Sequence, residues 1–472
     1  MKSMVRSIRP SLSRRLSFSS SRQFPLIRIV FAIAVAAGVF YAARLDAQDN
    51  VFTGTNKGAA KIRIAVADFK AANSDSQTAQ PKTTFDSTLY SDLANAGVFD
   101  VVSKSMLPSG SPGAPSEVHL QAYSDPPPNA SFLAFGSIGV SGGKLLVNGF
   151  LYDAKNQQFP QVLAKQYSGD VSEESARQIA HQFADEIIVH LGGGLPGICE
   201  SKIYYVKQEG ANKEIWMMDY DGANQHQVTH LGTISIGPRV APDNSRIAFE
   251  SLGKNGFQIR MYSLLLNRLV TFSSVGGTNI TPAWSPDGNQ IAFSSSRSGD
   301  PEIWIADSNG ALARQVTHFR GPDSSPTFNP RSGAQIAWIS DRTGLPQLYI
   351  MNTDGTAVQQ LTDGGYVSSP SWSPNGQWIA FAWNRKYGPG APGGEDIYMM
   401  DIATKAWTQL THDSGQCDFP SWSPDGRHIV YACSPNGNTP RSRIYSLLVS
   451  DGSASAHALT GAGGDMPNWS WR

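Results

Sequence analysis

Residues 282–295 read PAWSPDGNQIAFSS, and nearly the same phrase returns further along the chain as PSWSPNGQWIAFAW and PSWSPDGRHIVYAC. Fainter copies are present as well, and the chain stops six residues into another one, PNWSWR. The prolines that open these copies are Pro238, Pro282, Pro326, Pro370, Pro420 and Pro467. They are spaced by 44, 44, 44, 50 and 47 residues, a period typical of the four-stranded blade of a β-propeller.

Each repeat predicts four short strands. The first ends in Trp or Phe before a Ser-Pro-Asp-Gly turn, and the second is an apolar run such as QIAFSSS. The third and fourth, for example EIWIADS and ARQVTHF, are separated by an Asn-Gly or Asp-Gly turn, which is a strong hairpin signal. The repeat therefore predicts an antiparallel sheet.

The two ends of the repeat region indicate how many blades there are. Residues 202–237 contain the last three strands of a repeat without the first one, and the terminal PNWSWR supplies a first strand without the rest. Together with five complete repeats they predict six blades, with the C-terminus closing the ring. Closure removes the row of unpaired N–H and C=O groups that an open sheet edge would present.

A different pattern precedes the repeats. A strand at 61–69, a helix from Pro81 to about Ala96, three further strands and a helix from Ser172 to Leu191 predict a small α/β domain. The fold class is thus multidomain, an α/β domain followed by an all-β propeller. The expected domains are an export signal at 1–47, the α/β domain at 48–198 and the propeller at 199–472.

Composition excludes some classes of function. The chain is 40% apolar and only 16% charged, so it can bury a large core. Residues 1–47 hold eight Lys or Arg and one acid, which leaves 30 Lys or Arg against 37 acids in the rest. A mildly acidic body lacks the clustered cations that grip phosphate backbones, so we expect no nucleic-acid partner.

The basic N-terminus is followed by the apolar run IVFAIAVAAGVFYAA, residues 29–43. This order is typical of a secretory signal, here cut after Ala47, and the run is short for a membrane span. An uncleaved anchor stays open, because Leu45 stands where a small residue is usual. We expect an exported protein.

An exported protein folds in an oxidising compartment, so its three cysteines could form a disulfide. Cys417 and Cys433 flank one Ser-Pro-Asp-Gly turn at equal distances, so folding that hairpin sets them opposite one another. A disulfide and two buried thiols are both compatible with this pattern. Cys199 has no partner and is expected to pack at the domain junction.

One motif matches the sequence pattern around a catalytic serine. GVSGG, at 139–143, fits the G-x-S-x-G pattern of serine hydrolases. That mechanism needs the serine on a strand-to-helix elbow with Asp and His partners later in the chain. Here the Gly-Gly pair joins two predicted strands, so we expect a hairpin turn and no catalytic residues.

Two patterns suggest metal ligands. His230, His318 and His412 occupy equivalent repeat positions, which lie far apart around a ring, so a structural role at the strand end is expected. DYDG at 219–222 looks like the start of a calcium loop but lacks the later acidic ligands. Because it coincides with the Asp-Gly turn of the other repeats, we expect a turn, with no metal or cofactor.

The repeat also indicates where a partner would bind. The Ser-Pro-Asp-Gly turns lie on one face of the ring, whereas the loops of the opposite face vary from blade to blade, as binding loops on a fixed scaffold do. The residues just before the repeat prolines should ring the channel mouth on that variable face. They are Gly237, Thr281, Ser325, Ser369, Phe419 and Met466. For Arg297, Arg342 and Arg385, which begin loops nearby, we expect pairing with local backbone.

The whole arrangement resembles the TolB family, the periplasmic component of the Tol-Pal system of Gram-negative bacteria. The resemblance rests on units of the form PxWSPDGxxIAFxSxRxGxxxIYxMDxDGxxxxQLT, on the closing PNWSWR and on the approach GICESKIYYVKQEG. It covers roughly 48–472. The repeat phrase alone also occurs in peptidase propellers and other exported repeat proteins.

The resemblance implies a binding protein with no small-molecule substrate. TolB-like proteins hold the lipoprotein Pal at the channel mouth, where bacteriocin (colicin) peptides can also bind. Notable matching positions are Thr278, Thr281, Asp323 and Ser325. The family's mature N-terminal segment engages the inner-membrane protein TolA. Here that segment is short and would include Gln48, Asp49, Asn50, Val51 and Phe52.

We therefore expect a non-catalytic adaptor that supports outer-membrane integrity and envelope constriction during cell division. One alternative is an exported hydrolase or lyase that carries a propeller, which would need a nucleophile with a base or clustered metal ligands. Another is a glycan-binding propeller, favoured if exposed aromatic residues line the mouth.

Overall fold

The protein is represented by a computed structural model, which describes residues 61–73, 75–273, 276–388, 393–412, 414–434 and 442–471. The predicted export signal and the segment 48–55 lie outside these residues, as do parts of two loops on the variable face. The described residues belong to one compact unit. None of the described helices is long and apolar enough to cross a bilayer.

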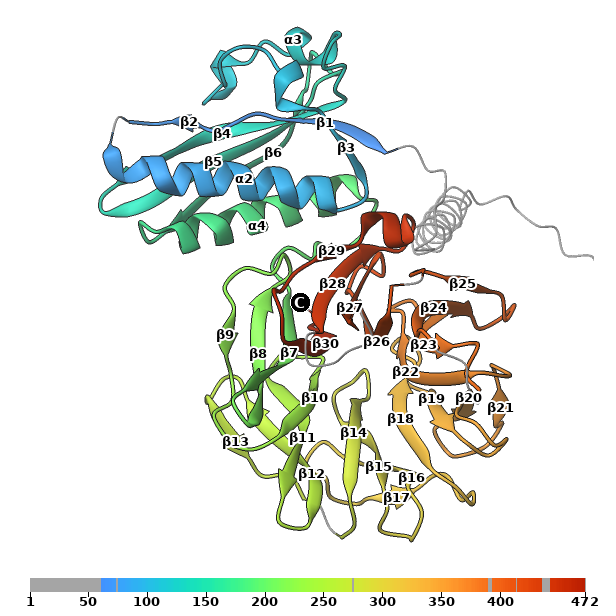
Figure 1. Ribbon diagram of the computed structural model, residues 1–472. Coiled ribbons are helices and arrows are strands. Elements are labelled where there is room, and N and C mark those ends of the chain that lie inside the picture. Colours follow the sequence, from blue (N-terminus) through green and yellow to red (C-terminus); the bar gives the residue numbers. More distant parts are fainter. Residues whose placement is uncertain are drawn as a thin grey trace, which may run out of the picture. The chain divides into compact units, whose positions relative to one another are not determined.

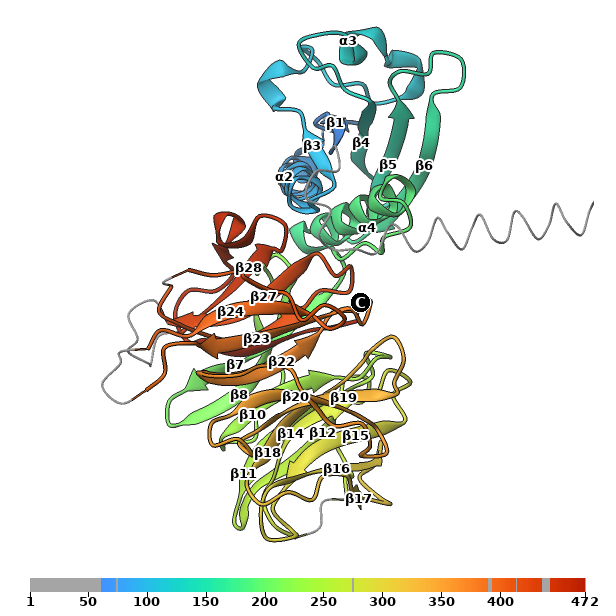
Figure 2. The same ribbon diagram turned by 90° about the vertical axis from the view of Figure 1, so that its right-hand side faces the viewer.

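The N-terminal part is an α/β domain built on one mixed sheet (Figures 1 and 2). The sheet has the order β3-β1-β4-β5-β6, with β2 also paired to β4. Its strands are β1 (Ile62–Val66), β2 (Lys70–Ala71), β3 (Phe99–Val101), β4 (Phe132–Ser141), β5 (Lys144–Asp153) and β6 (Gln161–Gly169). The α-helices are α2 (Ala79–Asn95), α3 (Gln121–Ser124) and α4 (Glu173–Leu191), and short 3-10 turns η1 (Ser76–Thr78), η2 (Lys104–Met106) and η3 (Pro115–Glu117) join them.

Helices α2 and α4 pack against each other on one face of this sheet (Figure 2). The Ser172 hydroxyl caps α4 by accepting the Ser175 N–H at 3.1 Å, and the acids of its first turn favour the positive end of the helix dipole. Helix α2 has Pro81 in its first turn and stops before Gly97. Both predicted helices are confirmed to within two residues at each end.

Gly97 shows why α2 must end where it does. Its φ is +73°, and a Cβ there would lie 2.7 Å from a methyl carbon of Leu448 in the propeller. Only glycine fits both the left-handed backbone and this close approach.

The propeller consists of six four-stranded antiparallel sheets. Blade 1 is split between the chain ends, with the order β30-β7-β8-β9, and blades 2 to 6 follow in sequence. The strands of blades 1 to 3 are β7 (Lys202–Glu209), β8 (Asn212–Asp219), β9 (His226–Gln227), β10 (Ser235–Val240), β11 (Arg246–Gly253), β12 (Gly256–Ser263), β13 (Arg268–Val270), β14 (Asn279–Trp284), β15 (Gln290–Ser295), β16 (Glu302–Asp307) and β17 (Arg314–Gln315).

Blades 4 to 6 and the closing strand complete the ring (Figure 1). They are β18 (Asp323–Phe328), β19 (Gln335–Ser340), β20 (Gln347–Asn352), β21 (Gln359–Gln360), β22 (Tyr366–Trp372), β23 (Trp378–Asn384), β24 (Asp396–Asp401), β25 (Trp407–Gln409), β26 (Gln416–Trp422), β27 (His428–Ser434), β28 (Arg443–Leu448), β29 (His457–Ala458) and β30 (Gly464–Trp469), with a 3-10 turn η4 (Gly452–Ser455). The innermost strands contact one another in the cyclic order β10, β14, β18, β22, β26 and β30, and β30 contacts β10.

Ring closure follows the sequence prediction. Strand β30 pairs antiparallel with β7, and the register sets Trp469 opposite Ile203. Lys202 and Ser470 exchange two hydrogen bonds of 2.8 Å, and the Trp469 indole donates to the Ser201 hydroxyl at 2.7 Å. The predicted six-bladed architecture is therefore confirmed.

The repeated tryptophan ties blades 3, 5 and 6 to the blade before each of them, whereas blades 2 and 4 have Val240 and Phe328 at this position. The indole N–H groups of Trp284, Trp372 and Trp422 donate to carbonyls of the preceding innermost strand at 2.9, 3.2 and 3.1 Å. A buried indole N–H usually has such a partner. The Trp of the PxWSPDG phrase thus serves inter-blade packing.

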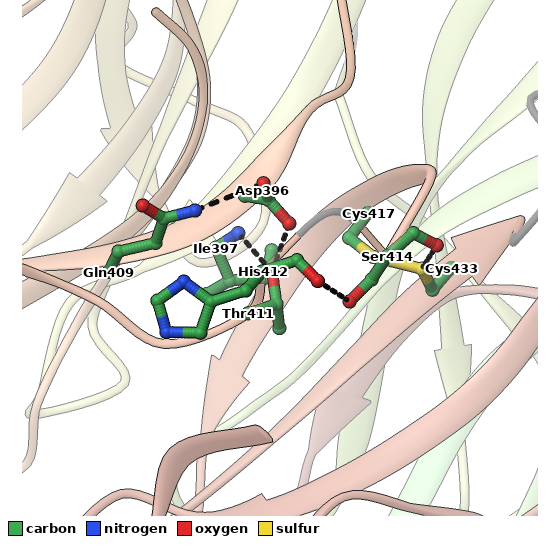
Figure 3. The surroundings of a disulfide bond; sticks show 8 residues. All are labelled: Asp396, Ile397, Gln409, Thr411, His412, Ser414, Cys417 and Cys433. Atoms are coloured by element: carbon green, nitrogen blue, oxygen red, sulfur yellow. Dashed lines mark hydrogen bonds between the residues drawn. A yellow bond between two sulfur atoms is a disulfide. The ribbon is translucent and has the colours of Figure 1, made fainter. Parts of the chain in front are cut away.

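The Thr of the repeated QVTH or QLTH phrase has the structural role that we expected of the histidine. Thr411 accepts the Ile397 N–H at 2.9 Å and donates to Asp396 at 2.7 Å (Figure 3). Thr229 and Thr317 make the same pair of bonds in blades 1 and 3. The three histidines that follow these threonines are exposed. The expectation for the histidines was therefore wrong, because the short hydroxyl, not the imidazole, reaches the buried backbone.

GVSGG lies where strand β4 turns into β5. Its Gly142 and Gly143 take the left-handed φ values of +59° and +75°, and Ser141 pairs with Lys144 across the hairpin. The predicted hairpin turn is confirmed.

The α/β domain and the propeller share one buried core. The cluster joins residues of α2 and α4 to residues of blades 1 and 6, and it includes Cys199. At its edge, His428 Nε2 contacts the Asn95 carbonyl at 2.8 Å and Arg427 donates to the Gly97 carbonyl at 2.7 Å. The end of α2 is thereby attached to the Ser-Pro-Asp-Gly turn of blade 6.

Blade 6 carries a disulfide (Figure 3). Cys417 on β26 lies directly opposite Cys433 on β27, and the two are joined with an S–S distance of 2.02 Å. Both cysteines are buried. Cys199 is a free, buried thiol.

Replacing Trp469 by Ala should lower the free energy of unfolding by about 3–5 kcal/mol, because a 4% exposed indole and its hydrogen bond are lost at the closing strand. Denaturant unfolding measures the change. Trp407→Ala is the control, since Trp407 is 41% exposed, and it should cost at most about 1 kcal/mol. Equal losses in both variants would contradict a special role for closure.

Alkylation in denaturant should add one group per chain without reductant and three groups after reduction, if the disulfide forms in the exported protein. Intact mass spectrometry counts the groups. Cys199→Ser should shift these numbers to none and two. Three groups on the unreduced wild type would show that the bond is absent.

Candidate functional site

A ring of six residues surrounds the axis of the propeller. Each sits at a β-bulge of an innermost strand, directly before the repeat proline, and each has a left-handed backbone. The residues and their φ values are Gly237 (61°), Thr281 (52°), Ser325 (52°), Ser369 (49°), Phe419 (56°) and Met466 (46°). These are the residues that the sequence predicted for the mouth ring, and we call them the mouth ring below.

This backbone conformation is costly. For residues other than glycine it costs about 1–3 kcal/mol each, and a β-branched residue such as Thr281 is a pronounced outlier there. A following proline also disfavours helical conformations at the preceding residue. The strain recurs around the ring because each bulge bends an innermost strand at the same depth.

The mouth ring lines an axial cavity of about 300 Å³. Other lining groups are four of the six repeat prolines, prolines of the Ser-Pro-Asp-Gly turns and the inter-blade tryptophans. The ionisable residues among those that line it are Arg239 and Glu250. The described lining therefore holds no histidine or cysteine that could act as base or nucleophile.

Hydrogen bonds connect neighbouring blades at the mouth. Glu250 of β11 accepts the Thr281 N–H of the next blade at 2.9 Å. The Thr281 hydroxyl in turn accepts the Ser325 N–H of the blade after that at 3.1 Å. Three consecutive blades are thus fixed to each other through the strained residues.

Glu250 titrates far from its usual range. Burial raises its pKa to about 7, although the Thr281 N–H and the nearby charge of Arg239 oppose the rise. The sequence contained a signal that Glu250 is a buried acid. It occupies the repeat position at which the third blade has the buried Ser294. An acid at a buried strand position of a repeat is unusual.

A pair of acidic residues, Glu395 and Asp418, lies between blades 5 and 6. The Ser368 hydroxyl is 2.8 Å from Glu395 and 3.2 Å from Asp418. Burial raises the pKa of Glu395 to about 7, and the charge of Asp418 adds to the rise. Burial also raises the pKa of Asp418 to about 6. Sequence reasoning missed this pair, because the two acids come from different blades.

Two residues named by the family resemblance lie apart from the cavity lining. Asp323 is fully buried and pairs with Arg342 at 3.1 Å. The backbone N–H of Thr278 donates to the Ser296 hydroxyl at 2.9 Å. The predicted partner-binding residues Gln48–Phe52 lie outside the described residues.

The three arginines pair with side chains, not with backbone as we expected. Arg297 donates to Ser295 and lies over the ring of Trp304. Arg342 lies over three aromatic rings, and Arg385 stacks on two tryptophans. Planar guanidinium groups suit such stacking, which explains why these loops begin with arginine.

Six blades closed by the C-terminal strand, an axial cavity and an N-terminal α/β domain define a two-domain β-propeller protein. Residues 193–388 and 364–472 match the family described as TolB beta propeller domain. Residues 55–159 match the TolB amino-terminal domain. The chain belongs to the TolB family.

Known relatives agree with this assignment. The Protein TolB homolog of Chlorobium chlorochromatii (strain CaD3) is 31% identical over 202 residues, which are 42% of this chain and 44% of the relative. The Tol-Pal system protein TolB of Gluconobacter oxydans (strain 621H) is 34% identical over 298 residues, 62% of this chain and 63% of the relative. The matched segments thus span about half to two thirds of these relatives.

The fold has a solved counterpart. The crystal structure of TolB from Acinetobacter baumannii superposes with a TM-score of 0.71 at 24% identity, covering 87% of this chain and 97% of that one. The similarity shows that the two proteins share their fold.

The raised pKa of Glu250 predicts a pH dependence of stability. The folded state favours the protonated acid, so the contribution of Glu250 is complete below about pH 4.5 and is lost as the pH rises through about 7. Between pH 5 and 8, Glu250→Gln should therefore gain stability relative to wild type, by up to about 3 kcal/mol. Urea unfolding at the two pH values measures this.

Asp287→Asn is the matched control for this experiment. The Ser285 hydroxyl and the Asn289 N–H lower the pKa of exposed Asp287, so its contribution changes only in more acidic solution. The difference between this variant and wild type should be the same at pH 5 and pH 8. A Glu250→Gln difference that is equally flat would refute the assignment.

Proposed function

We propose that the protein is a periplasmic, non-catalytic adaptor that binds partner proteins of the Tol-Pal system at the mouth ring. The observation that carries the proposal is the ring itself, in which six blades set six left-handed residues, five of them strained, around one cavity. Strain that the surrounding structure maintains is often associated with binding sites. Relatives named as Tol-Pal system proteins support the system, and the apolar run at 29–43 supports export.

The geometry suits a short inserted segment of a partner. A cavity of about 300 Å³ is at the small end of ligand pockets and has room for only a few side chains. A folded partner would therefore rest on the variable loops and insert a few residues. Because the bulges and the bonds through Glu250, Thr281 and Ser325 fix the ring in advance, little ordering is needed on binding.

The partners are proposed from the family. A Pal-like lipoprotein would occupy the mouth, and bacteriocin peptides could compete for it. A TolA-like inner-membrane protein would bind the segment that begins at Gln48, since a flexible segment can add a strand to a partner's sheet. Together these contacts would support outer-membrane integrity and cell division.

Catalysis is the less favoured alternative. The cavity offers hydroxyl groups, but its two ionisable residues bond to backbone: Arg239 donates to the Pro238 carbonyl and Glu250 accepts the Thr281 N–H. A serine nucleophile needs a base within hydrogen-bond reach. The observations therefore favour binding over a hydrolase or lyase.

Thr281→Arg should weaken binding of the host's own Pal homologue at least tenfold, about 1.4 kcal/mol, because the long cation enters the cavity mouth. Isothermal titration calorimetry with purified proteins measures the affinity. Leu312→Arg is the matched control. Leu312 lies in the same blade at the opposite end of the strands, is 88% exposed and already has a left-handed φ of 54°. The control should bind like wild type.

Unchanged affinity in Thr281→Arg, or no binding by wild type, would refute the mouth-ring proposal. A chain lacking residues 48–55 should keep its Pal affinity and lose binding to a TolA-like domain. Titration with envelope glycan fragments separates the glycan alternative, since the proposal requires that they do not compete with Pal.

A further inference from the structure

A polar cluster lies where helix α4 meets the turn after β8. It contains His181 of α4 together with Asp219 and Asp221 of the DYDG sequence. One nitrogen or oxygen atom from each side chain lies within 4.8 Å of those of the other two. His181 is 38 and 40 positions away from the two aspartates in the chain, so only the fold brings the imidazole to the two carboxylates. None of these three residues belongs to the mouth ring, and none is one of the buried acids described above.

The orientation of His181 is determined by Asp92. His181 Nδ1 lies 2.8 Å from one oxygen of Asp92, and the Tyr220 hydroxyl donates to the other oxygen at 2.6 Å. Since an ionised carboxylate only accepts hydrogen bonds, Nδ1 is the donor. In the neutral ring this leaves the lone pair on Nε2, the other ring nitrogen.

Nε2 is the unusual atom of the cluster. His181 is 2% exposed, and Nε2 has no hydrogen-bond partner among the described residues. A buried ring nitrogen without a partner is unfavourable unless a proton or a cation satisfies it. This unpartnered atom is independent of the acidic residues and points to a missing ligand.

The charges of the cluster leave room for a cation. Arg177 donates to Asp221 at 2.6 Å, and Lys202 and Asn224 each donate to Asp219 at 2.6 Å. Two basic groups thus face three carboxylates, including Asp92. Each carboxylate oxygen can accept more than one bond, so Asp219 and Asp221 retain free lone pairs.

We propose that His181, Asp219 and Asp221 form a binding site for a divalent transition-metal ion of the zinc type. Imidazole nitrogen and carboxylate oxygen are ordinary zinc ligands, and three protein ligands leave a position for water. The Asp92–His181 pair reproduces the carboxylate–histidine arrangement that typically orients a metal-bound imidazole. Calcium and magnesium prefer oxygen ligands only, so the histidine selects against them.

The distances are compatible with modest closure around the ion. Zinc bonds of about 2.0–2.2 Å hold tetrahedral ligand atoms roughly 3.3–3.6 Å apart. Atoms within 4.8 Å of one another therefore need to approach by up to about 1.5 Å. Rotation of the Asp221 side chain can supply much of this, because it is partly exposed. The bound ion would tie α4 of the α/β domain to blade 1.

A proton on Nε2 is the competing occupant. Burial alone lowers the pKa of His181, but the hydrogen bond to Asp92 and the charges of Asp92, Asp221 and Asp219 raise it above the ordinary value overall. A protonated ring would satisfy the charge without any metal. Metal binding must then release this proton, so zinc affinity should fall as the pH is lowered.

The test is a titration of the purified, chelator-treated protein with Zn²⁺ by calorimetry and with Co²⁺ by visible absorption. We expect one ion per chain, cobalt bands typical of a four-coordinate nitrogen–oxygen site, and a higher thermal midpoint with excess Zn²⁺. His181→Gln should weaken the affinity at least 100-fold. His190→Gln is the matched control, since His190 is exposed on the same helix, and it should bind like wild type.

Asp221→Asn keeps the test decisive if His181→Gln does not fold, because Asp221 lies at the partly exposed edge of the cluster. It should weaken Zn²⁺ at least tenfold and alter the cobalt spectrum. The proposal is overturned if wild type binds neither ion. Binding that survives in the folded cluster variants, or that is lost in His190→Gln, overturns it as well. So does nitrogen NMR that finds Nε2 of His181 protonated and unaffected by zinc.

Discussion

The structure depends on the pairing of β30 with β7, which joins the two ends of the propeller chain. This pairing completes blade 1, and it brings β30 into contact with β10 and β26 so that the innermost strands form a closed ring. Without it, two sheet edges would expose unpaired backbone groups. The Trp469 indole stands at the position of the repeated tryptophan, but it donates to the Ser201 hydroxyl next to β7 and so fastens the closing strand within blade 1. Every later feature of the site presupposes this ring.

Ring geometry turns an ordinary repeat into a candidate binding site. In one blade, a left-handed residue before a proline is a local bulge with a local cost. In six blades around an axis, these bulges place small or apolar side chains around a single cavity. Buried acids such as Glu250 stabilise the ring through the backbone N–H of the next blade, and their raised pKa is a consequence of that burial. The same contacts that make the mouth rigid also make it sensitive to pH.

The split of blade 1 between the chain ends also affects how the α/β domain is attached to the propeller. Blades 1 and 6 share a buried core with α2 and α4, so the α/β domain packs on the part of the ring that closes last along the chain. At this junction Asp92 orients His181 toward the turn after β8. The proposed metal site and the ring closure are therefore coupled through the same two strands, β7 and β8, which carry Lys202 and Asp219.

Local patterns in the sequence determined the secondary structure, the number of blades and the mouth ring. A 44-residue period, turn residues with obligatory conformations and a helix cap such as Ser172 act over a few residues, so they can be recognised without the fold. The sequence misled us about Thr411 and His412, where the depth of burial decides which side chain bonds. It also misled us about the three loop arginines, which pair with side chains and not with backbone. Contacts between distant segments were decided by the tertiary structure. Asp418 meets Glu395 across two blades, and His181 meets Asp219 across two domains, and neither the distance nor the burial that shifts their pKa values is encoded in a local pattern.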